Sequence, residues 1–331
     1  MKNILRITLS FLLAAAILWW MYRGVQWSEL RVALSEDMDW RWMWLSFPFG
    51  IMAQVFRAMR WRQLLAPLGE RSRLRTAINA IFLSYASSLA LPRVGEVLRC
   101  GTLSTYDGTN FSHAIGTVVT ERIVDMLLVL AFSVLTMMTQ IPVFLKFFHQ
   151  TGISLQGILQ GFTATGYLVT AICALCILLT GVILVRRLHF FSRLRHVIKD
   201  FSAGLTSITQ LRHPLLFSFY SIGIWVCYYL HFSIALYCFP QTAALGPIVA
   251  LVAFVVGCFA VLVPTPNGAG PWHFAVKTVL VLYGVNQLAA VTSVLVIHTV
   301  QTALVALLGL YALLTPTKPS TPTQPSSGGR Q

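Results

Sequence analysis

Six ionisable residues lie at helical spacing in two short stretches of this chain. The first stretch contributes Arg93, Glu96 and Arg99, and the second contributes Glu121, Arg122 and Asp125. Residues three or four apart share one face of a helix, so each stretch presents its charges together. Guanidinium groups bind phosphate oxygens in pairs, and carboxylates order such a site or exchange protons with it. These residue types therefore suit a phosphate-bearing anionic head group.

The same charges also have a purely structural interpretation. An ionised side chain at membrane depth costs several kcal/mol, so such residues usually face a charged partner or a water-filled cavity. Glu121, Arg122 and Asp125 would then form ion pairs that tie their helix to the preceding segment. The residues alone leave both interpretations open.

A second group of candidate residues surrounds the strongest helix breaker in the chain, VPTPNGAGPWHF. Proline and glycine at this density end a helix. The group consists of Pro264, Pro266, Asn267, Gly268 and Gly270, followed by His273 and Lys277. A histidine in an apolar segment is commonly a satisfied hydrogen-bonding residue, but its titration near neutral pH would also permit proton exchange. We expect this break to line the same cavity as the charged stretches.

No residue pattern in the chain indicates a metal site, a cofactor or a catalytic triad. Cys173 and Cys176 have CxxC spacing, but they lie inside an apolar run without further ligands, where cysteine packs as a small apolar residue. The sequence also lacks a phosphate-binding glycine loop and a nucleophile elbow. We therefore expect neither metal nor cofactor, and we expect that the protein is not an enzyme.

Composition identifies the environment of these residues. Of 331 residues, 56% are hydrophobic and 10% are charged, whereas about 25% are charged in soluble domains. The chain is therefore predicted to be an all-α, polytopic integral membrane protein. Its 24 lysines and arginines against 10 acidic residues cluster between apolar runs. This pattern is typical of cytoplasmic loops and does not favour nucleic acid as a partner.

Hydropathy predicts about six full transmembrane helices, since about 20 apolar residues cross the hydrocarbon core. The predicted spans cover residues 4–22, 40–61, 112–138, 157–185, 215–239 and 286–314. Arginines at 57, 60 and 62 are taken to end the second span and, with those at 71, 73 and 75, to hold the next loop in the cytoplasm.

Two broken hairpins complete the predicted topology. Residues 76–110 must leave and return to the cytoplasmic side, and Pro92 ends the incoming helix, so this region is predicted to be re-entrant with Pro92 near its tip. Residues 243–283 form either a second hairpin that enters from the opposite face or a spanning segment, and the sequence leaves this choice open; the hairpin is the arrangement we adopt. Such an arrangement is compatible with an inverted repeat. Both termini are then cytoplasmic, with residues 1–314 as the membrane domain and residues 315–331 as a disordered tail rich in proline, serine and threonine.

The order of three motifs resembles a known family. LPRVGEVLR, then ERIVD, then PTPNGAG are similar to the lysylphosphatidylglycerol synthase transmembrane region, also called the flippase-like domain family, over about residues 1–314. By position, four residues match the first motif of the family: Pro92, Glu96 and Arg99, already named, and also Gly95. Where the family often has glutamate after the last glycine, this chain has His273, so a fixed negative charge is missing there.

The resemblance implies a bacterial inner-membrane protein with re-entrant helices. Such a protein would move an anionic or aminoacylated phospholipid, or another lipid-linked group, between leaflets. The soluble aminoacyl-transferase domain of the full-length synthases is absent, so lipid synthesis is not expected. Passive and proton-coupled transport both remain open. The rival hypotheses are a scaffold of an envelope or lipid biosynthesis complex, and an intramembrane enzyme acting on a lipid phosphate. A homodimer or a membrane-complex partner is compatible with each of these.

Overall fold

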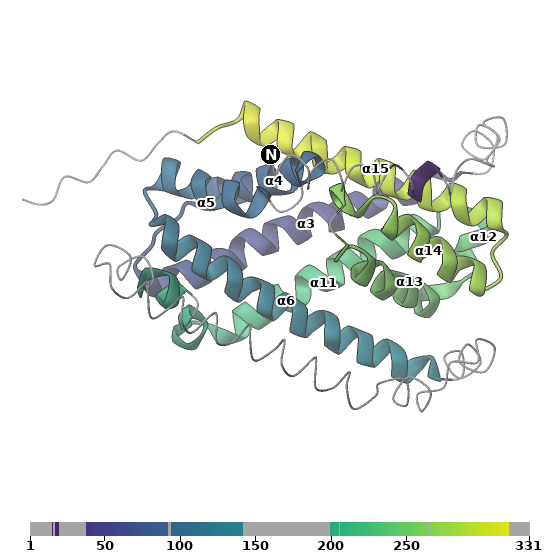
Figure 1. Cartoon of the computed structure of the whole chain (residues 1–331), viewed down its shortest axis with the longest axis horizontal. Coiled ribbons are helices and arrows are strands. Elements are labelled where there is room, and N and C mark those ends of the chain that lie inside the picture. Colours follow the sequence, from purple (N-terminus) through teal and green to yellow (C-terminus); the bar gives the residue numbers. More distant parts are fainter. Residues whose placement is uncertain are drawn as a thin grey trace, which may run out of the picture.

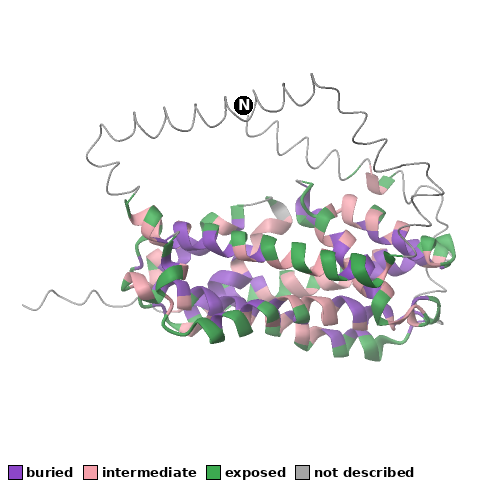
Figure 2. Cartoon of the chain, turned by 90° about the horizontal axis from the view of Figure 1, so that it is seen from below, coloured by how far each residue is buried: buried purple, intermediate pink, exposed green. Residues whose placement is uncertain are grey.

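The computed structural model describes residues 15, 17–19, 38–91, 94–141, 199–204, 206–263 and 265–317, except for the side chain of residue 90. Every regular element within these ranges is a helix, and the long helices lie roughly along one common direction (Figure 1). Buried residues gather between the helices, while exposed residues lie on their outer faces (Figure 2). The predicted all-α class is confirmed.

The described helices fall into two halves of the same order: one long helix, two short helices and another long helix. The first half consists of α3 (Trp40–Leu65), α4 (Leu74–Ala90), α5 (Val94–Asp107) and α6 (Phe111–Thr139). The second half consists of α11 (Pro214–Leu236), α13 (Gly246–Ala260), α14 (Pro271–Leu282) and α15 (Gln287–Leu314). Single turns occur at η1 (Ala66–Leu68), η2 (Ser207–Gln210), α12 (Pro240–Ala243) and η3 (Pro266–Gly268).

Local sequence signals set where the long helices begin. The side chains of Asp39, Asn110 and Asn286 accept hydrogen bonds from the first backbone N–H groups of α3, α6 and α15. Asparagine and aspartate are preferred at this position because they satisfy donors that the helix itself leaves without partners. Proline opens α11 and α14, where its missing N–H costs nothing.

The first predicted hairpin is present, because α4 and α5 pack against each other along their length. Gly95 permits this approach, since a Cβ there would overlap the carbonyl oxygen of Ser84. At the open end, Arg73 Nε contacts Asp107 Oδ1 at 2.7 Å, so the hairpin enters and leaves at one face of the bundle. Pro92, predicted at the tip, lies outside the described residues.

The second predicted hairpin is formed by α13 and α14, which also pack against each other. Gly257 allows Trp272 to approach, because a Cβ there would lie 2.7 Å from the indole nitrogen. These helices have 15 and 12 residues, too few to cross a core of roughly 30 Å alone. Their connection contains positive φ angles at Asn267, Gly268 and Gly270.

The two halves are related as an inverted repeat. Corresponding helices make corresponding contacts: α4 packs on α15 as α13 packs on α6, and α5 packs on α6 as α14 packs on α15. The first helices of the halves, α3 and α11, share the largest interface and run antiparallel, since Asp39 N, at the start of α3, donates to Cys238 O, just past the end of α11. The hairpins therefore enter the bundle from opposite faces, as predicted.

The described helices match four of the six predicted spans. By length and composition alone, α11 and α15 could cross a membrane. Helices α3 and α6 are as long, with 26 and 29 residues, but carry ionised residues in their interiors. The predicted spans at 4–22, apart from four of its residues, and at 157–185 lie outside the described residues, so the total number of spans stays a prediction.

Two arginines predicted to lie at the cytoplasmic end of the second span lie inside the bundle instead. Arg57 and Arg60 were counted among the loop arginines, but their side chains are buried inside the bundle, and α3 continues to Leu65. Span boundaries drawn from hydropathy end at the first charges, although paired charges are tolerated within a helix. At the start of the predicted tail, Asn79 Nδ2 donates to the backbone oxygen of Thr315, and residues 318–331 lie outside the described part.

Candidate functional site

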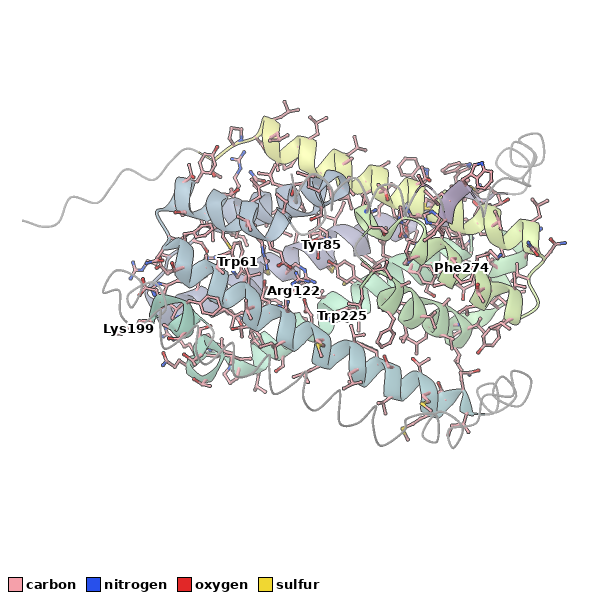
Figure 3. All side chains as sticks on the ribbon, viewed as in Figure 1. Trp61, Tyr85, Arg122, Lys199, Trp225 and Phe274 are labelled. Carbon is pink, nitrogen blue, oxygen red and sulfur yellow. The ribbon has the colours of Figure 1, made fainter. Side chains whose placement is uncertain are left out.

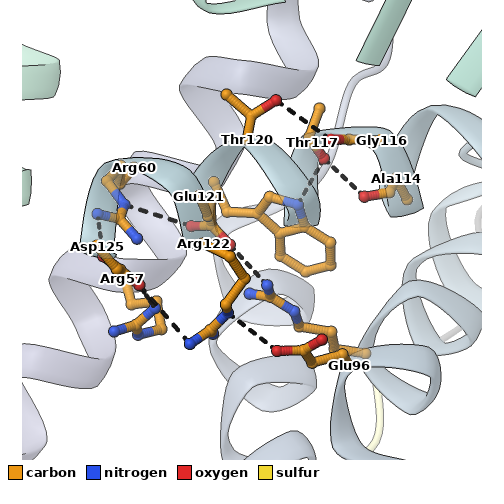
Figure 4. Close-up of polar contacts among 12 residues, drawn as sticks. Arg57, Arg60, Glu96, Ala114, Gly116, Thr117, Thr120, Glu121, Arg122 and Asp125 are labelled. Atoms are coloured by element: carbon orange, nitrogen blue, oxygen red, sulfur yellow. Dashed lines mark hydrogen bonds and ion pairs between the residues drawn. The ribbon is translucent and has the colours of Figure 1, made fainter. Parts of the chain in front are cut away.

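A cluster of charged side chains lies where α3, α5 and α6 meet (Figure 4). Among the described residues it contains four arginines and three carboxylates: Arg57, Arg60, Arg99, Arg122, Glu96, Glu121 and Asp125. We refer to these seven residues as the charge cluster. The sequence placed five of them on α5 and α6, and the structure adds two from α3.

Asp125 is bound by two arginines of α3, Arg57 and Arg60. Arg57 Nη1 donates to one carboxylate oxygen at 2.9 Å, and Arg60 Nη1 donates to the other at 2.7 Å. The three side chains are at most 7% exposed. Because Arg57 and Arg60 are three residues apart, one face of α3 presents both to α6.

Glu121 lies one helical turn before Asp125 and bridges α3 to α5. It accepts from Arg60 Nε at 3.4 Å and contacts Arg99 Nη2 at 2.7 Å. The contact with Arg99 is close enough for an ion pair, but it lacks the direction of a hydrogen bond. Arg99 also covers the ring of Trp61 at 4.7 Å, and Trp61 Nε1 donates to Thr117 Oγ1 at 3.0 Å.

The remaining pair is less buried. Arg122 Nε contacts Glu96 Oε1 at 2.9 Å, and the two side chains are 45% and 39% exposed. Arg122 also reaches Asp125 at 3.7 Å, which joins the outer pair to the buried part. Helix α5 therefore meets α6 through two crossed ion pairs, Arg99 with Glu121 and Glu96 with Arg122, of which only the second is accessible.

The arginines of the charge cluster outnumber its carboxylates, and several of their N–H donors have no acceptor within the cluster. Within the described residues it has one net positive charge. Arg99 Nε and Nη1, Arg57 Nε and Arg60 Nη2 are buried without a hydrogen-bond partner in the described part of the chain. Buried polar atoms without partners are uncommon and costly, so donors in this number call for an acceptor-rich group.

An aromatic pair links the charge cluster to the second half of the chain. The hydroxyl groups of Tyr85 on α4 and Tyr228 on α11 are 2.9 Å apart. The guanidinium of Arg57 lies 5.8 Å and 5.9 Å from the centres of their rings. Figure 3 shows Tyr85 and Arg122 near the centre of the bundle. Neither tyrosine was predicted from the sequence.

The break before α14 is held by side chains from α15. Asn267 Nδ2 donates to Thr302 Oγ1 at 2.7 Å, and the backbone oxygen of Asn267 lies 3.2 Å from His298 Nε2. His273 Nδ1 accepts from the backbone N–H of Gly270 at 3.3 Å, so this histidine caps α14. The rings of His273 and His298 are 4.3 Å apart. The interpretation of His273 as a hydrogen-bonding residue has structural support.

The predicted site residues thus separate into groups. Glu96, Arg99, Glu121, Arg122 and Asp125 come together in the charge cluster. Pro266, Asn267, Gly268, Gly270 and His273 form the connection before α14. Lys277 makes no ion pair with a described residue. Arg93, Pro92 and Pro264 lie outside the described residues.

That both groups line one cavity stays a prediction. The η3 turn of the second hairpin contacts α4 of the first, so the inner parts of the two hairpins meet. No group of three or more potential metal ligands lies together in the described part of the chain.

The comparison with known families agrees with this architecture. A family model described as the lysylphosphatidylglycerol synthase TM region matches residues 7–309. The chain belongs to this family. The match covers both helical halves and every residue of the charge cluster, and it makes the chain a membrane protein. No curated protein and no solved structure matches the chain.

Two contributors to the site were missed by sequence reasoning. Arg60 and Trp61 follow Arg57 by three and four residues, and both point into the bundle. The signal for them was this helical spacing within an apolar span, which was read as a span end instead. Membership of the family does not assign roles to these residues.

Proposed function

We propose that this chain transfers a phospholipid with an anionic or aminoacylated head group, or another lipid-linked group, between the leaflets of a bacterial inner membrane. In this proposal the head group passes by the charge cluster while the acyl chains stay in the bilayer. The protein changes no covalent bond of the lipid, and both termini face the cytoplasm.

The observation that carries the proposal is the environment of Arg99. Its side chain is 1% exposed, it forms an ion pair with Glu121, and none of its three nitrogens makes a hydrogen bond to a described residue. The ion pair with Glu121 and the contact with Trp61 satisfy only part of this guanidinium, and burying the rest without acceptors costs free energy. A phosphate oxygen supplies acceptors of the correct charge and geometry.

The two hairpins support the same proposal. In the second hairpin the chain leaves helical geometry at Asn267, between α13 and α14, and side chains of α15 bind this residue, as non-helical backbone at membrane depth requires. Paired broken helices that meet near the midplane are typical of substrate sites in inverted-repeat transporters. The meeting of the η3 turn with α4 is consistent with this arrangement.

The experiment is a leaflet-exchange assay in proteoliposomes with a fluorescent phosphatidylglycerol. Arg99→Gln removes the charge and most of the donors but leaves Glu121 paired to Arg60. We therefore expect a folded protein whose exchange rate falls at least ten-fold. Arg62→Gln is the matched control, because Arg62 lies on α3 near the cluster and donates instead to the backbone oxygen of Ser72. Wild-type exchange in folded Arg99→Gln would contradict the proposal.

The same samples test the two rivals. The scaffold hypothesis is supported by the ion pairs of Asp125 with two arginines, which would stabilise any helical bundle. This hypothesis predicts that the wild-type protein exchanges no lipid. Mass spectrometry of the recovered lipid tests the enzyme hypothesis, because intramembrane chemistry on a lipid phosphate would change the mass of the lipid. Exchange without a change of mass supports transport.

A further inference from the structure

The two crossed ion pairs between α5 and α6 differ in accessibility, and this difference assigns them different roles. Arg99 and Glu121 are at most 1% exposed, while Glu96 and Arg122 are 39% and 45% exposed. Separating a buried pair leaves an uncompensated charge, whereas an exposed pair contributes little and exchanges partners easily. The Glu96–Arg122 pair is the accessible part of the cluster.

Arg122 is arranged so that it can lose Glu96 without becoming isolated. Its Nε contacts Glu96, and its Nη1 lies 3.7 Å from Asp125, which Arg57 and Arg60 hold in place. Glu96 has no second cationic partner among the described residues. A competing anion would therefore displace Glu96 and leave Arg122 attached to the cluster.

The surface beside this pair is apolar. On α5 the exposed large side chains include Val94, Val97 and Leu98, which are 42%, 54% and 41% exposed. On α6 they include Ile123 and Met126, which are 51% and 74% exposed. A membrane protein exposes such a band where lipid chains contact it. A charged pair whose neighbours along both helices are exposed and apolar fits a phosphate attached to acyl chains better than free phosphate in water.

We propose that the Glu96–Arg122 ion pair is the exchangeable gate of the charge cluster. The head-group phosphate of a lipid replaces Glu96 as the partner of Arg122, and this opens the way from the lipid-facing surface to Arg99. Glu96 is the competitor that closes the site when lipid is absent. This inference depends on the proposed function and adds how lipid reaches the site.

If Glu96 and Arg122 form a gate, substitutions of the two residues should change the lipid exchange rate in opposite directions. With the proteoliposome assay above, Arg122→Gln loses the docking group, so exchange of phosphatidylglycerol should fall at least ten-fold. Glu96→Gln loses the competitor, so exchange at low lipid content should rise about two-fold or more. If the Glu96–Arg122 pair only holds α5 against α6, both variants should lose lipid exchange and thermal stability. Equal losses, or no change in either variant, would overturn the gate.

The control is the Arg73–Asp107 pair of the same hairpin, in which the arginine is also 45% exposed and the carboxylate is 2% exposed. This pair lies at the open end of the hairpin, away from the apolar band, and Arg73→Gln and Asp107→Asn should both exchange lipid at the wild-type rate. If Arg73→Gln and Asp107→Asn changed the exchange rate as much as Arg122→Gln and Glu96→Gln do, the effect would come from losing any ion pair of the hairpin and not from the gate.

A binding measurement separates failure of the gate from failure of the proposed function. Purified protein in detergent is titrated with phosphatidylglycerol, and its thermal stabilisation is recorded. We expect half-saturation at several-fold lower lipid in Glu96→Gln than in the wild type, and at several-fold higher lipid in Arg122→Gln. If wild-type protein exchanges no lipid, the transport proposal fails, but this shift still tests the gate. Equivalent stabilisation by inorganic phosphate would show that the site takes the free anion and would overturn the lipid gate.

Discussion

At the scale of single residues, some charged side chains of this protein are buried and paired inside the bundle, and others are exposed at the helix ends. Arg60 is completely buried and contacts both Glu121 and Asp125, so three ionised groups depend on one another. Removing one member of such a group leaves its partners buried without compensation, which commonly costs more than the group contributed. The exposed arginines at the helix ends have no comparable role.

Replacement of Arg60 should therefore be the most damaging change to a single arginine. We expect Arg60→Met to lower the free energy of unfolding by about 3–5 kcal/mol. Reversible unfolding in mixed micelles measures this loss, with Arg41→Met at the exposed start of α3 as the control, expected within about 0.5 kcal/mol of the wild type. Equal stability of the two variants would mean that Arg60 is not a structural part of the cluster.

At the scale of elements, the position of α5 decides whether its charges reach α6. Helix α5 lies close to α4 because Gly95 faces the backbone of Ser84. Ser88 of α4 also lies within 2.6 Å of where a Cβ at position 95 would be placed. One glycine near the start of a 14-residue helix thus helps to set the positions of Glu96 and Arg99.

The two glycines of α5 offer a matched pair of substitutions. Gly95→Ala should destabilise the protein by about 1–3 kcal/mol, because the methyl group meets backbone that cannot move aside. Gly101→Ala should be neutral or stabilise by up to about 1 kcal/mol, since its Cβ meets open space and alanine favours a helix. Thermal unfolding of both variants tests this, and identical midpoints would contradict the packing of α4 on α5.

At the scale of the whole molecule, the inverted repeat places each hairpin against the last helix of the other half. Gly309 of α15 packs against Ala86 of α4, with no room for a Cβ between them. One face of the bundle therefore carries the end of α3 and the start of α6, and the opposite face carries the end of α11 and the start of α13. Accessibility from the two sides of the membrane follows from this arrangement.

Cysteine labelling in cells checks the two faces. In a background without native cysteines, Arg71→Cys and Arg212→Cys should react only with reagent that reaches the cytoplasm, and Gln241→Cys should react from outside. Native Cys238 would add little signal at neutral pH if retained, because burial raises the pKa of its thiol to about 12 and the neutral thiol is a poor nucleophile. Labelling of residue 71 and residue 241 from the same side would contradict the inverted arrangement.

Sequence alone determined the class of the protein and the first hairpin, and it offered a second hairpin of opposite direction as one of two possibilities for residues 243–283. These features depend on local properties: apolar length, the helix-breaking chemistry of Pro92 and of the segment at 264–271, and the side on which basic loops lie. It also placed Glu96, Arg99, Glu121, Arg122 and Asp125 in one candidate site, because helical spacing shows which charges share a face.

Only the tertiary structure decided how those charges are paired. Ion pairs between helices depend on distances that no single stretch of sequence contains, so only the packing of α3 beside α6 shows that Arg57 and Arg60 bind Asp125. The same holds for the contact between Tyr85 and Tyr228, which are 143 residues apart in the chain. The difference in burial between the Arg99–Glu121 and Glu96–Arg122 pairs is also a property of packing, and the proposed gate rests on it.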